Sequence, residues 1–162
     1  MKLVLLRHAK SSWKHELPDH ERPLSGRGRR DAPVVGQRIA EAGFSPDLVL
    51  SSDSTRTRQT WARMKDALGD PPVRWLPEFY LADPTTIFGK LAELDGPETV
   101  PGTVVVLGHN PGWEDALAEL GHPRRFTTCN AALLQNDATT WREALNEPWT
   151  LVDLIRPRPP RG

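Results

Sequence analysis

The chain lacks a second cysteine, a long apolar run and a net charge. Its single cysteine, Cys129, excludes an internal disulfide framework and is expected to be a small packed residue. No apolar run approaches the roughly 20 residues that a membrane span needs. The run "LVLL" near the start is also too short for the apolar core of a signal peptide. We therefore expect a cytoplasmic protein that does not bind membranes.

The charges sum to zero but are unevenly distributed. Residues 1–30 carry eight Lys or Arg against three Asp or Glu, and residues 31–155 carry ten against eighteen. The last segment, 156–162, adds three arginines. A basic segment on a neutral protein favours a local anion site over a broad nucleic-acid surface, although ordinary solvated charges would give the same pattern. We expect no nucleic-acid partner.

What the chain does contain is an alternation of short apolar runs and helical patterns. At 162 residues, with 38% apolar and 26% charged side chains, it suits one globular domain. Runs rich in Val and Leu predict buried parallel strands at 2–6, 47–52 and 103–109. Further strands are predicted at 131–135 and 149–155, and helices at 27–42, 54–68, 84–95 and 112–120.

This alternation predicts an α/β domain over residues 1–155, built as a mostly parallel central sheet with helices on both faces. Gly43 is the expected C-cap of the first helix. The Pro/Arg-rich tail, 156–162, cannot form a helix or a central strand and is expected to be extended.

Basic side chains follow three of the predicted strands. The first strand ends in Arg7 and His8, the second leads into a helix that carries Arg56, and the third ends in His109 and Asn110. Ligands of open α/β sheets gather at the carboxyl ends of the strands. If these three strands are neighbours, two histidines and at least two arginines meet in one pocket.

Such a pocket is suited to a phosphoryl group. Arginine forks match tetrahedral oxyanions, and nearby positive charge lowers the pKa of a histidine, which keeps its imidazole neutral and nucleophilic. The alternative is that His8 and His109 bind a metal ion. Arginines beside a ligand histidine would oppose cation binding, so we expect no metal.

Four motifs in order resemble the histidine phosphatase superfamily, also called phosphoglycerate-mutase-like. They are "RHAKSSW", "HERPLSGRGRRDAP", "PDLVLSSDSTRTRQT" and "GHNPG". Within that superfamily they are similar to the SixA-type phosphohistidine phosphatase branch. The resemblance covers residues 2 to about 155. It implies a three-layer phosphoglycerate-mutase-like fold and a phosphatase that needs no cofactor.

The resemblance also implies roles for individual residues. His8 would be the nucleophile that becomes phosphohistidine, and Arg7 and Arg56 would clamp the phosphoryl oxygens. His109 would be the second histidine of the pocket and would donate to the same phosphoryl group. Further residues that would contact phosphate or the rim of the site are Ser11, Lys10, Lys14 and Asn110.

The general acid is the least defined role. The resemblance implies a carboxylate after the second helix, for which Glu78 is the first candidate and Asp83 the second; Glu78 as a plain surface carboxylate is the alternative. An oxygen leaving group needs a proton in the transition state. A phosphohistidine protonated at its other ring nitrogen leaves as neutral imidazole and needs an acid less. Asp19, His20 and Glu21 form a polar cluster that a solvated loop explains equally well.

The expected substrate is phosphohistidine on a protein, since a short chain leaves little to form a lid and an open site suits a phosphorylated side chain. Two alternatives stay open at this point. One is a phosphatase of small phosphate esters, and the other is a catalytically weak module that binds phosphoproteins. Mutase activity is a third possibility, disfavoured because a short chain has little with which to retain a small intermediate.

Overall fold

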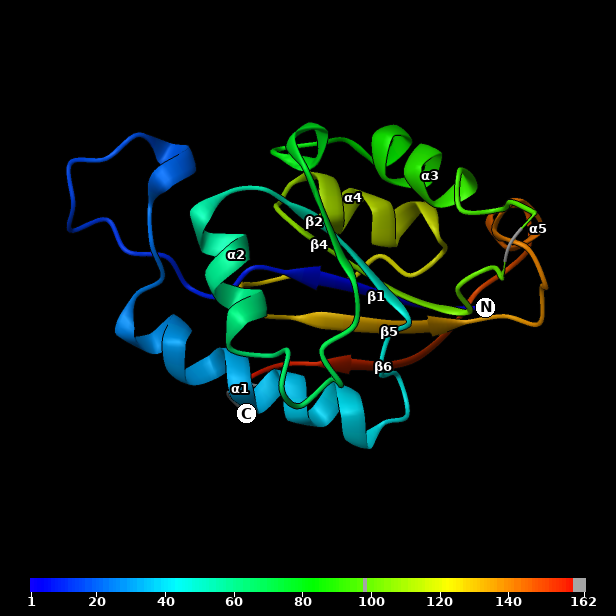
Figure 1. Ribbon diagram of the computed structural model, residues 1–162, viewed down its shortest axis with the longest axis horizontal. Coiled ribbons are helices and arrows are strands. Elements are labelled where there is room, and N and C mark those ends of the chain that lie inside the picture. The colour runs from blue at the N-terminus through cyan, green and yellow to red at the C-terminus, as the bar shows by residue number, and fades with distance from the viewer. Residues whose placement is uncertain (98, 159–162) are drawn as a thin grey trace.

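One mixed sheet of six strands forms the centre of the computed structural model, which describes residues 1–97 and 99–158 (Figure 1). The strand order across the sheet is β3-β2-β4-β1-β5-β6. Strands β3, β2, β4 and β1 pair in parallel, whereas β5 is antiparallel to both β1 and β6. The strands are β1 (Lys2–Arg7), β2 (Leu48–Ser52), β3 (Val73–Leu76), β4 (Thr103–Gly108), β5 (Ala131–Gln135) and β6 (Thr150–Ile155).

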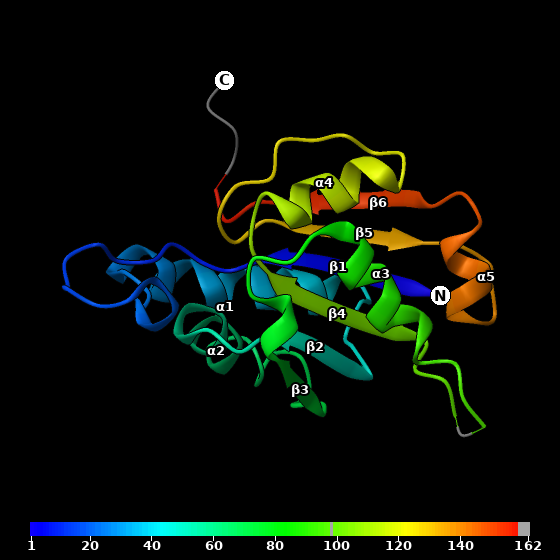
Figure 2. The same cartoon turned by 90° about the horizontal axis from the view of Figure 1, so that it is seen from above.

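Helices cover both faces of this sheet, with α1 and α2 on one side and α3 and α4 on the other (Figures 1 and 2). The predicted α/β architecture with a mostly parallel sheet is confirmed. The helices are α1 (Gly26–Glu41), α2 (Thr55–Ala62), α3 (Pro84–Ala92), α4 (Gly112–Glu119) and α5 (Trp141–Leu145), and two 3-10 turns are η1 (Asp19–Glu21) and η2 (Pro77–Phe79).

The first strand explains why a continuous apolar run is needed at the centre. Side chains alternate across a strand, so Leu3 and Leu5 pack into the apolar cluster under α3 and α4, while Val4 and Leu6 pack into the cluster under α1 and α2. All four side chains are fully buried. A strand with both faces covered cannot alternate apolar and polar residues. After this run, polar residues therefore appear at the carboxyl end of β1, where Arg7 and His8 lie.

Register places three strand ends together. Strand β4 lies between β1 and β2, with Arg7 opposite Gly108 and Ser51 opposite Leu107. The carboxyl ends of these three strands therefore lie side by side. A shared pocket for their arginines and histidines depends on this arrangement. Gly108 allows close packing there, because a Cβ on it would lie 2.3 Å from the ring of Trp113.

Several element boundaries differ from prediction. The helix predicted over 54–68 ends at Ala62, and the chain continues in tight turns, with the amide of Met64 donating to the carbonyl of Trp61. Strand β3 and helix α5 were not predicted, because four- and five-residue elements carry too little periodicity to detect. The Gly43 cap is confirmed by its positive φ of 81°.

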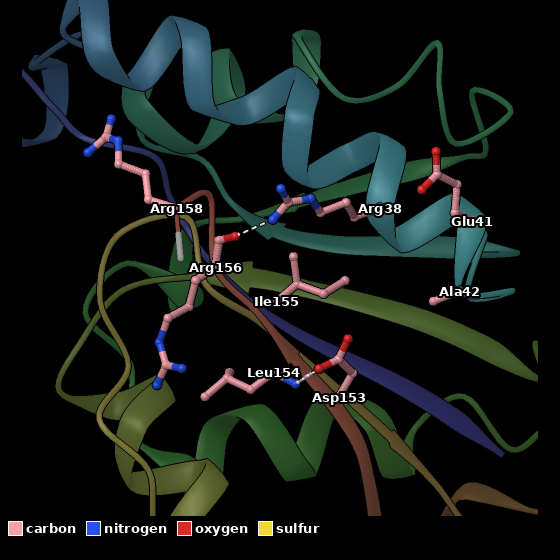
Figure 3. Close-up of a pocket in the computed structure, with 8 residues that line it drawn as sticks. All are labelled: Arg38, Glu41, Ala42, Asp153, Leu154, Ile155, Arg156 and Arg158. Atoms are coloured by element: carbon pink, nitrogen blue, oxygen red, sulfur yellow. Dashed lines mark hydrogen bonds between the residues drawn. The ribbon is translucent and has the colours of Figure 1, made fainter. Parts of the chain in front are cut away.

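The described start of the C-terminal tail lies against α1. The backbone oxygen of Arg156 accepts a hydrogen bond from Arg38 at 2.7 Å (Figure 3), and Arg158 donates to both carboxylate oxygens of the buried Asp31 at 3.0 and 3.2 Å. Arg38, Arg156 and Arg158 line a groove of about 700 Å³ between α1 and β6, which contains none of the predicted site residues. The rest of the expected extended tail, 159–162, lies outside the described residues.

Candidate active site

His8 is fixed by its own neighbours directly after β1. Its amide donates to the carbonyl of Gly108 at 3.1 Å, and its carbonyl accepts from the amide of Cys129 at 2.9 Å. The ring nitrogen Nδ1 lies 2.7 Å from the carbonyl oxygen of Ala9. A carbonyl only accepts, so Nδ1 carries the proton and Nε2 carries the lone pair in the neutral ring. The side chain is 6% exposed, and Nε2 is its nucleophilic atom.

Thr60 connects the backbone next to His8 with the helix that carries Arg56. The Thr60 hydroxyl accepts from the amide of Ala9 at 3.0 Å and donates to the carbonyl of Arg56 at 2.7 Å. Thr60 is fully buried on α2. One hydroxyl thus holds the backbone of Ala9 at its amide, and the carbonyl of the same residue contacts Nδ1 of His8.

Unpaired donors surround the nucleophile. Within the described part of the chain, buried side-chain nitrogens without a hydrogen-bond partner occur at Nε of Arg7, Nε of Arg56, Nδ1 of His109 and, away from the site, Nε1 of Trp149. Buried polar groups are nearly always paired in folded proteins. Three of these nitrogens belong to residues whose charge or ring acts on His8, which indicates that a ligand with several acceptor atoms could complete the site.

His109 completes this cluster from the end of β4. Its ring centroid lies 5.2 Å from that of His8, and its Nε2 lies 2.8 Å from the hydroxyl of Ser52 on β2. The Ser52 oxygen also accepts from the amide of Ser54 at 3.3 Å, so its own proton is available for Nε2. When the Ser52 hydroxyl donates to Nε2, the neutral ring carries its proton on Nδ1, which has no partner within the described part of the chain.

Both histidines are held in the neutral form. Burial lowers the pKa of His8 well below its ordinary value, and the nearby charges of Arg56 and Arg7 lower it further. Burial, reinforced by Arg56, lowers the pKa of His109 to about 3. At neutral pH, the ring of His8 is therefore uncharged, and its Nε2 carries a lone pair. The positive charge of the site comes from the arginines.

A carboxylate lies among these arginines. Arg56 donates from Nη2 to Oδ2 of Asp19 at 3.0 Å and from Nη1 to the backbone oxygen of Asp19 at 2.7 Å. Arg22 donates to Oδ1 of Asp19 at 3.0 Å, and the hydroxyl of Tyr80 donates to Oδ2. Chiefly through the bond from Tyr80, the pKa of Asp19 is held well below its usual range. Asp19 is thus ionised, and the polar cluster read as a solvated loop contributes to the site.

A family model described as the histidine phosphatase superfamily, branch 1, matches residues 3–80. An uncharacterized chloroplastic protein of Arabidopsis thaliana is 41% identical over 96% of this chain and 78% of its own. The chain belongs to the histidine phosphatase superfamily, branch 1. Its fold matches a SixA-type protein of Agrobacterium tumefaciens (TM-score 0.81, 28% identity, 97% and 98% of the two chains). It also matches the protein histidine phosphatase SixA complexed with tungstate (TM-score 0.82, 25% identity, 97% of each chain).

Membership of this superfamily leaves the cellular location a prediction. The Arabidopsis relative is described as chloroplastic, whereas we expected the cytoplasm. Across residues 1–97 and 99–158, no helix is long and apolar enough to cross a bilayer. The same ranges contain no group of three or more His, Cys, Asp or Glu side chains arranged to hold a metal ion.

The four central residues of the predicted histidine phosphatase site, His8, Arg7, Arg56 and His109, come together as described. Arg7 is half-buried and donates from Nη1 to the carbonyl of Phe126 at 3.3 Å, while its Nε is buried without a partner. The ring centroids of the two histidines lie 5.2 Å apart, and the charges of both arginines act on both rings. The catalytic roles of the four residues stay predictions.

The four rim residues lie in different surroundings. The buried Ser11 hydroxyl accepts from Nη1 of Arg22 at 2.7 Å, whereas Lys10 and Lys14 are exposed on the segment that follows. Asn110 donates to the carbonyl of Phe126 at 2.6 Å and accepts from the amide of Glu114, so its side chain supports the start of α4. Substrate contact by these four residues stays a prediction.

The two acid candidates point to other partners. Glu78 lies 3.8 Å from the ammonium group of Lys90 on α3, and Asp83 caps α3 by accepting from the amide of Thr86 at 3.0 Å. Tyr80, two residues after Glu78, is the group from this segment that reaches the site, with its ring 5.4 Å from that of His109. An acid role for Glu78 or Asp83 stays a prediction.

Sequence reasoning missed Asp19, Arg22, Ser52, Thr60 and Tyr80 as members of this neighbourhood. The sequence signals were present for some of them, since Arg22 lies in one of the recognised motifs and Thr60 follows Arg56 by one helical turn. Residues one turn apart share a helix face. That spacing identifies Thr60 as a residue on the pocket side of α2 once Arg56 is placed there.

Proposed function

We propose that this protein is a phosphatase that acts through a covalent phospho-His8 intermediate, with phosphohistidine on a protein as substrate. The observation that carries the proposal is a set of three buried nitrogens without a partner. They belong to Arg7, Arg56 and His109, which all act electrostatically on the neutral His8. A phosphoryl group offers three oxygens to such donors. It also places its phosphorus against the free lone pair of His8.

In the first step, Nε2 of His8 attacks phosphorus, the bond to the leaving group breaks, and its electron pair stays with the leaving group. Arg7 and Arg56 stabilise the charge on the transferring oxygens, and His109 donates to one of them. In the second step, water attacks phosphorus and the bond to Nε2 breaks. The products are inorganic phosphate and neutral His8, and the proton of the water is released. Neither step requires a metal ion.

Phosphohistidine is favoured as substrate by the position of the acid candidates. Both Glu78 and Asp83 bind groups of α3. An oxygen leaving group needs a proton in the transition state, whereas an imidazole already protonated on its other nitrogen leaves as a neutral base. A site without a placed acid is therefore suited to an N-phosphoryl substrate. The structural likeness to the protein histidine phosphatase SixA supports the same substrate class.

The experiment measures turnover of a phosphohistidine peptide, a phosphoserine peptide and small phosphate esters, side by side and in the presence of a strong chelator. The expected result is a clear preference for the phosphohistidine peptide with no loss of rate on chelation. A higher rate on small esters would favour the ester phosphatase instead, and loss of activity on chelation would favour a metal site.

Phosphoenzyme trapping separates catalysis from simple binding. A labelled phosphodonor should give an acid-labile, base-stable label on the wild-type protein and none on the His8→Ala variant. A protein that only binds phosphoproteins would show saturable affinity and no label. A label that persists in His8→Ala would show that the nucleophile is another residue.

A further inference from the structure

Arg56 is shared between the phosphoryl pocket and a carboxylate of the protein itself. Both of its terminal nitrogens donate to Asp19, one to the side chain at 3.0 Å and one to the backbone oxygen at 2.7 Å. A guanidinium carries five N–H donors; these two bonds use one on each terminal nitrogen, and the buried Nε has no partner. The arginine expected to clamp phosphate is thus already bound to an anion.

The carboxylate is positioned by two further groups. Arg22 donates from Nε to Oδ1 of Asp19 at 3.0 Å, and the hydroxyl of Tyr80 donates to Oδ2. The Tyr80 ring lies edge-on to His109, with 5.4 Å between ring centroids, so this cluster reaches the wall of the pocket. Asp19 therefore lies at the mouth of the site and not on a remote surface.

A phosphoryl group and the Asp19 carboxylate repel each other. Inside a partly buried site, two negative charges that share one guanidinium interact strongly, because solvent screens them less than at a free surface. We propose that Asp19 competes with phosphate for Arg56 and so weakens the binding of inorganic phosphate, the product of the reaction. This inference rests on the phosphoryl pocket of the proposed function.

The position of Asp19 in the fold suits a side chain that can release Arg56 and bind it again. It belongs to the short turn η1, within the segment between β1 and α1 that projects from the sheet (Figures 1 and 2). Its side chain is 44% exposed, whereas that of Arg56 is 4% exposed. Asp19 keeps the Arg22 bond as an alternative when Arg56 turns to a phosphoryl group.

The test is calorimetric titration of the full chain with inorganic phosphate at fixed ionic strength. Asp19→Asn removes the charge and keeps the size, so phosphate should bind about tenfold more tightly than to wild type, the change expected when a like charge is removed near a bound anion. Asp53→Asn is the matched control, because the Asp53 carboxylate binds Nε2 of His20 at 2.8 Å and no arginine of the site. Its affinity should stay within about twofold of wild type.

Tighter binding is informative because structural damage to a pocket lowers affinity. Unchanged or weaker phosphate binding by Asp19→Asn would overturn the role of Asp19. If that variant does not fold, Tyr80→Phe decides the question, since it removes one bond to the carboxylate without changing charge. A gain of about threefold in phosphate affinity for Tyr80→Phe would support the proposal, and no gain would overturn it. Absence of phosphate binding by wild type would overturn both this inference and the proposed phosphoryl pocket.

Discussion

The two sides of the pocket are built differently. On the inner side, His8, Ser52 and His109 lie at strand ends and are 6%, 0% and 1% exposed. On the outer side, the segment between β1 and α1 contains Trp13, which is 74% exposed, and the half-exposed side chain of Asp19. The inner side is attached to the central sheet, whereas the outer segment pairs with itself through Ser11 and Leu24 and contacts Arg56 and Tyr80 through Asp19.

In the proposed mechanism, this difference separates the groups that form and break bonds from the groups that contact the substrate. A nucleophile and its oxyanion donors must keep their geometry within a fraction of an ångström, and buried strand ends provide that rigidity. A surface that receives another protein gains from exposed aromatic and charged groups. Within the outer segment, the guanidinium of Arg22 stacks on the ring of Trp13, with 3.5 Å between Cζ and the ring centroid.

The largest expected effect comes from removing an inner cation. Arg56→Ala should lower kcat by about 10²–10³-fold, the usual cost of losing one donor to the developing charge. Lys14→Ala, which removes an exposed cation of the outer segment, should change kcat by less than about threefold, because solvent and salt screen it. Steady-state kinetics on one substrate compares the two. Similar losses in both variants would remove the distinction between inner and outer sides.

The next effect concerns pH. The pKa values of His8 and His109 are lowered in the folded protein, that of His109 to about 3, while the unfolded chain titrates near 6.5. Between these values the unfolded state binds more protons, so the free energy of unfolding falls as pH falls. Each histidine contributes a slope of about 1.4 kcal/mol per pH unit below pH 6. Urea unfolding at pH 7.5, 6 and 5 measures it.

A substitution variant isolates the share of one histidine in that slope. His109→Gln should make the dependence of unfolding free energy on pH shallower by about 1.4 kcal/mol per pH unit, because it removes one titrating group. An unchanged slope would show that burial does not keep His109 neutral.

A smaller effect is expected from the Thr60 hydroxyl, which holds the backbone next to His8. Thr60→Val leaves the buried amide of Ala9 without an acceptor, which should cost about 1–3 kcal/mol of unfolding free energy. It should also reduce the fraction of His8 that carries its proton on Nδ1, as seen in the ¹⁵N shifts of the ring. Thr60→Ser keeps the hydroxyl and should restore the tautomer. A wild-type tautomer in Thr60→Val would limit Thr60 to a structural role.

The smallest effect is expected from the C-terminal tail. Arg158→Ala removes the ion pair between the described start of the tail and Asp31 on α1. The arginine is half-exposed, so we expect a loss of about 0–1 kcal/mol in the free energy of unfolding, measured by urea titration, and no change in kcat. A fall in kcat would connect the tail to the pocket.

Much of the fold could be predicted from the sequence, because long apolar runs and capping residues act locally. The strands at 2–6 and 103–109 and the Gly43 cap needed no tertiary information. Strand β3 and helix α5 were missed because each is too short to show a period, and β3 gains its stability from pairing with β2. Within the site, His8, Arg7, Arg56 and His109 were predicted because each follows a strand or opens a helix.

The sequence by itself determined which strand ends carry arginine and histidine, since the polar break after a buried strand is a local feature. Only the tertiary structure decided that Asp19 reaches Arg56 and that Glu78 lies beside Lys90, because both depend on contacts between segments distant along the chain. Local patterns specify elements and their ends. The direction in which a loop side chain points is set by packing, which acts on residues 37 positions apart as readily as on neighbours.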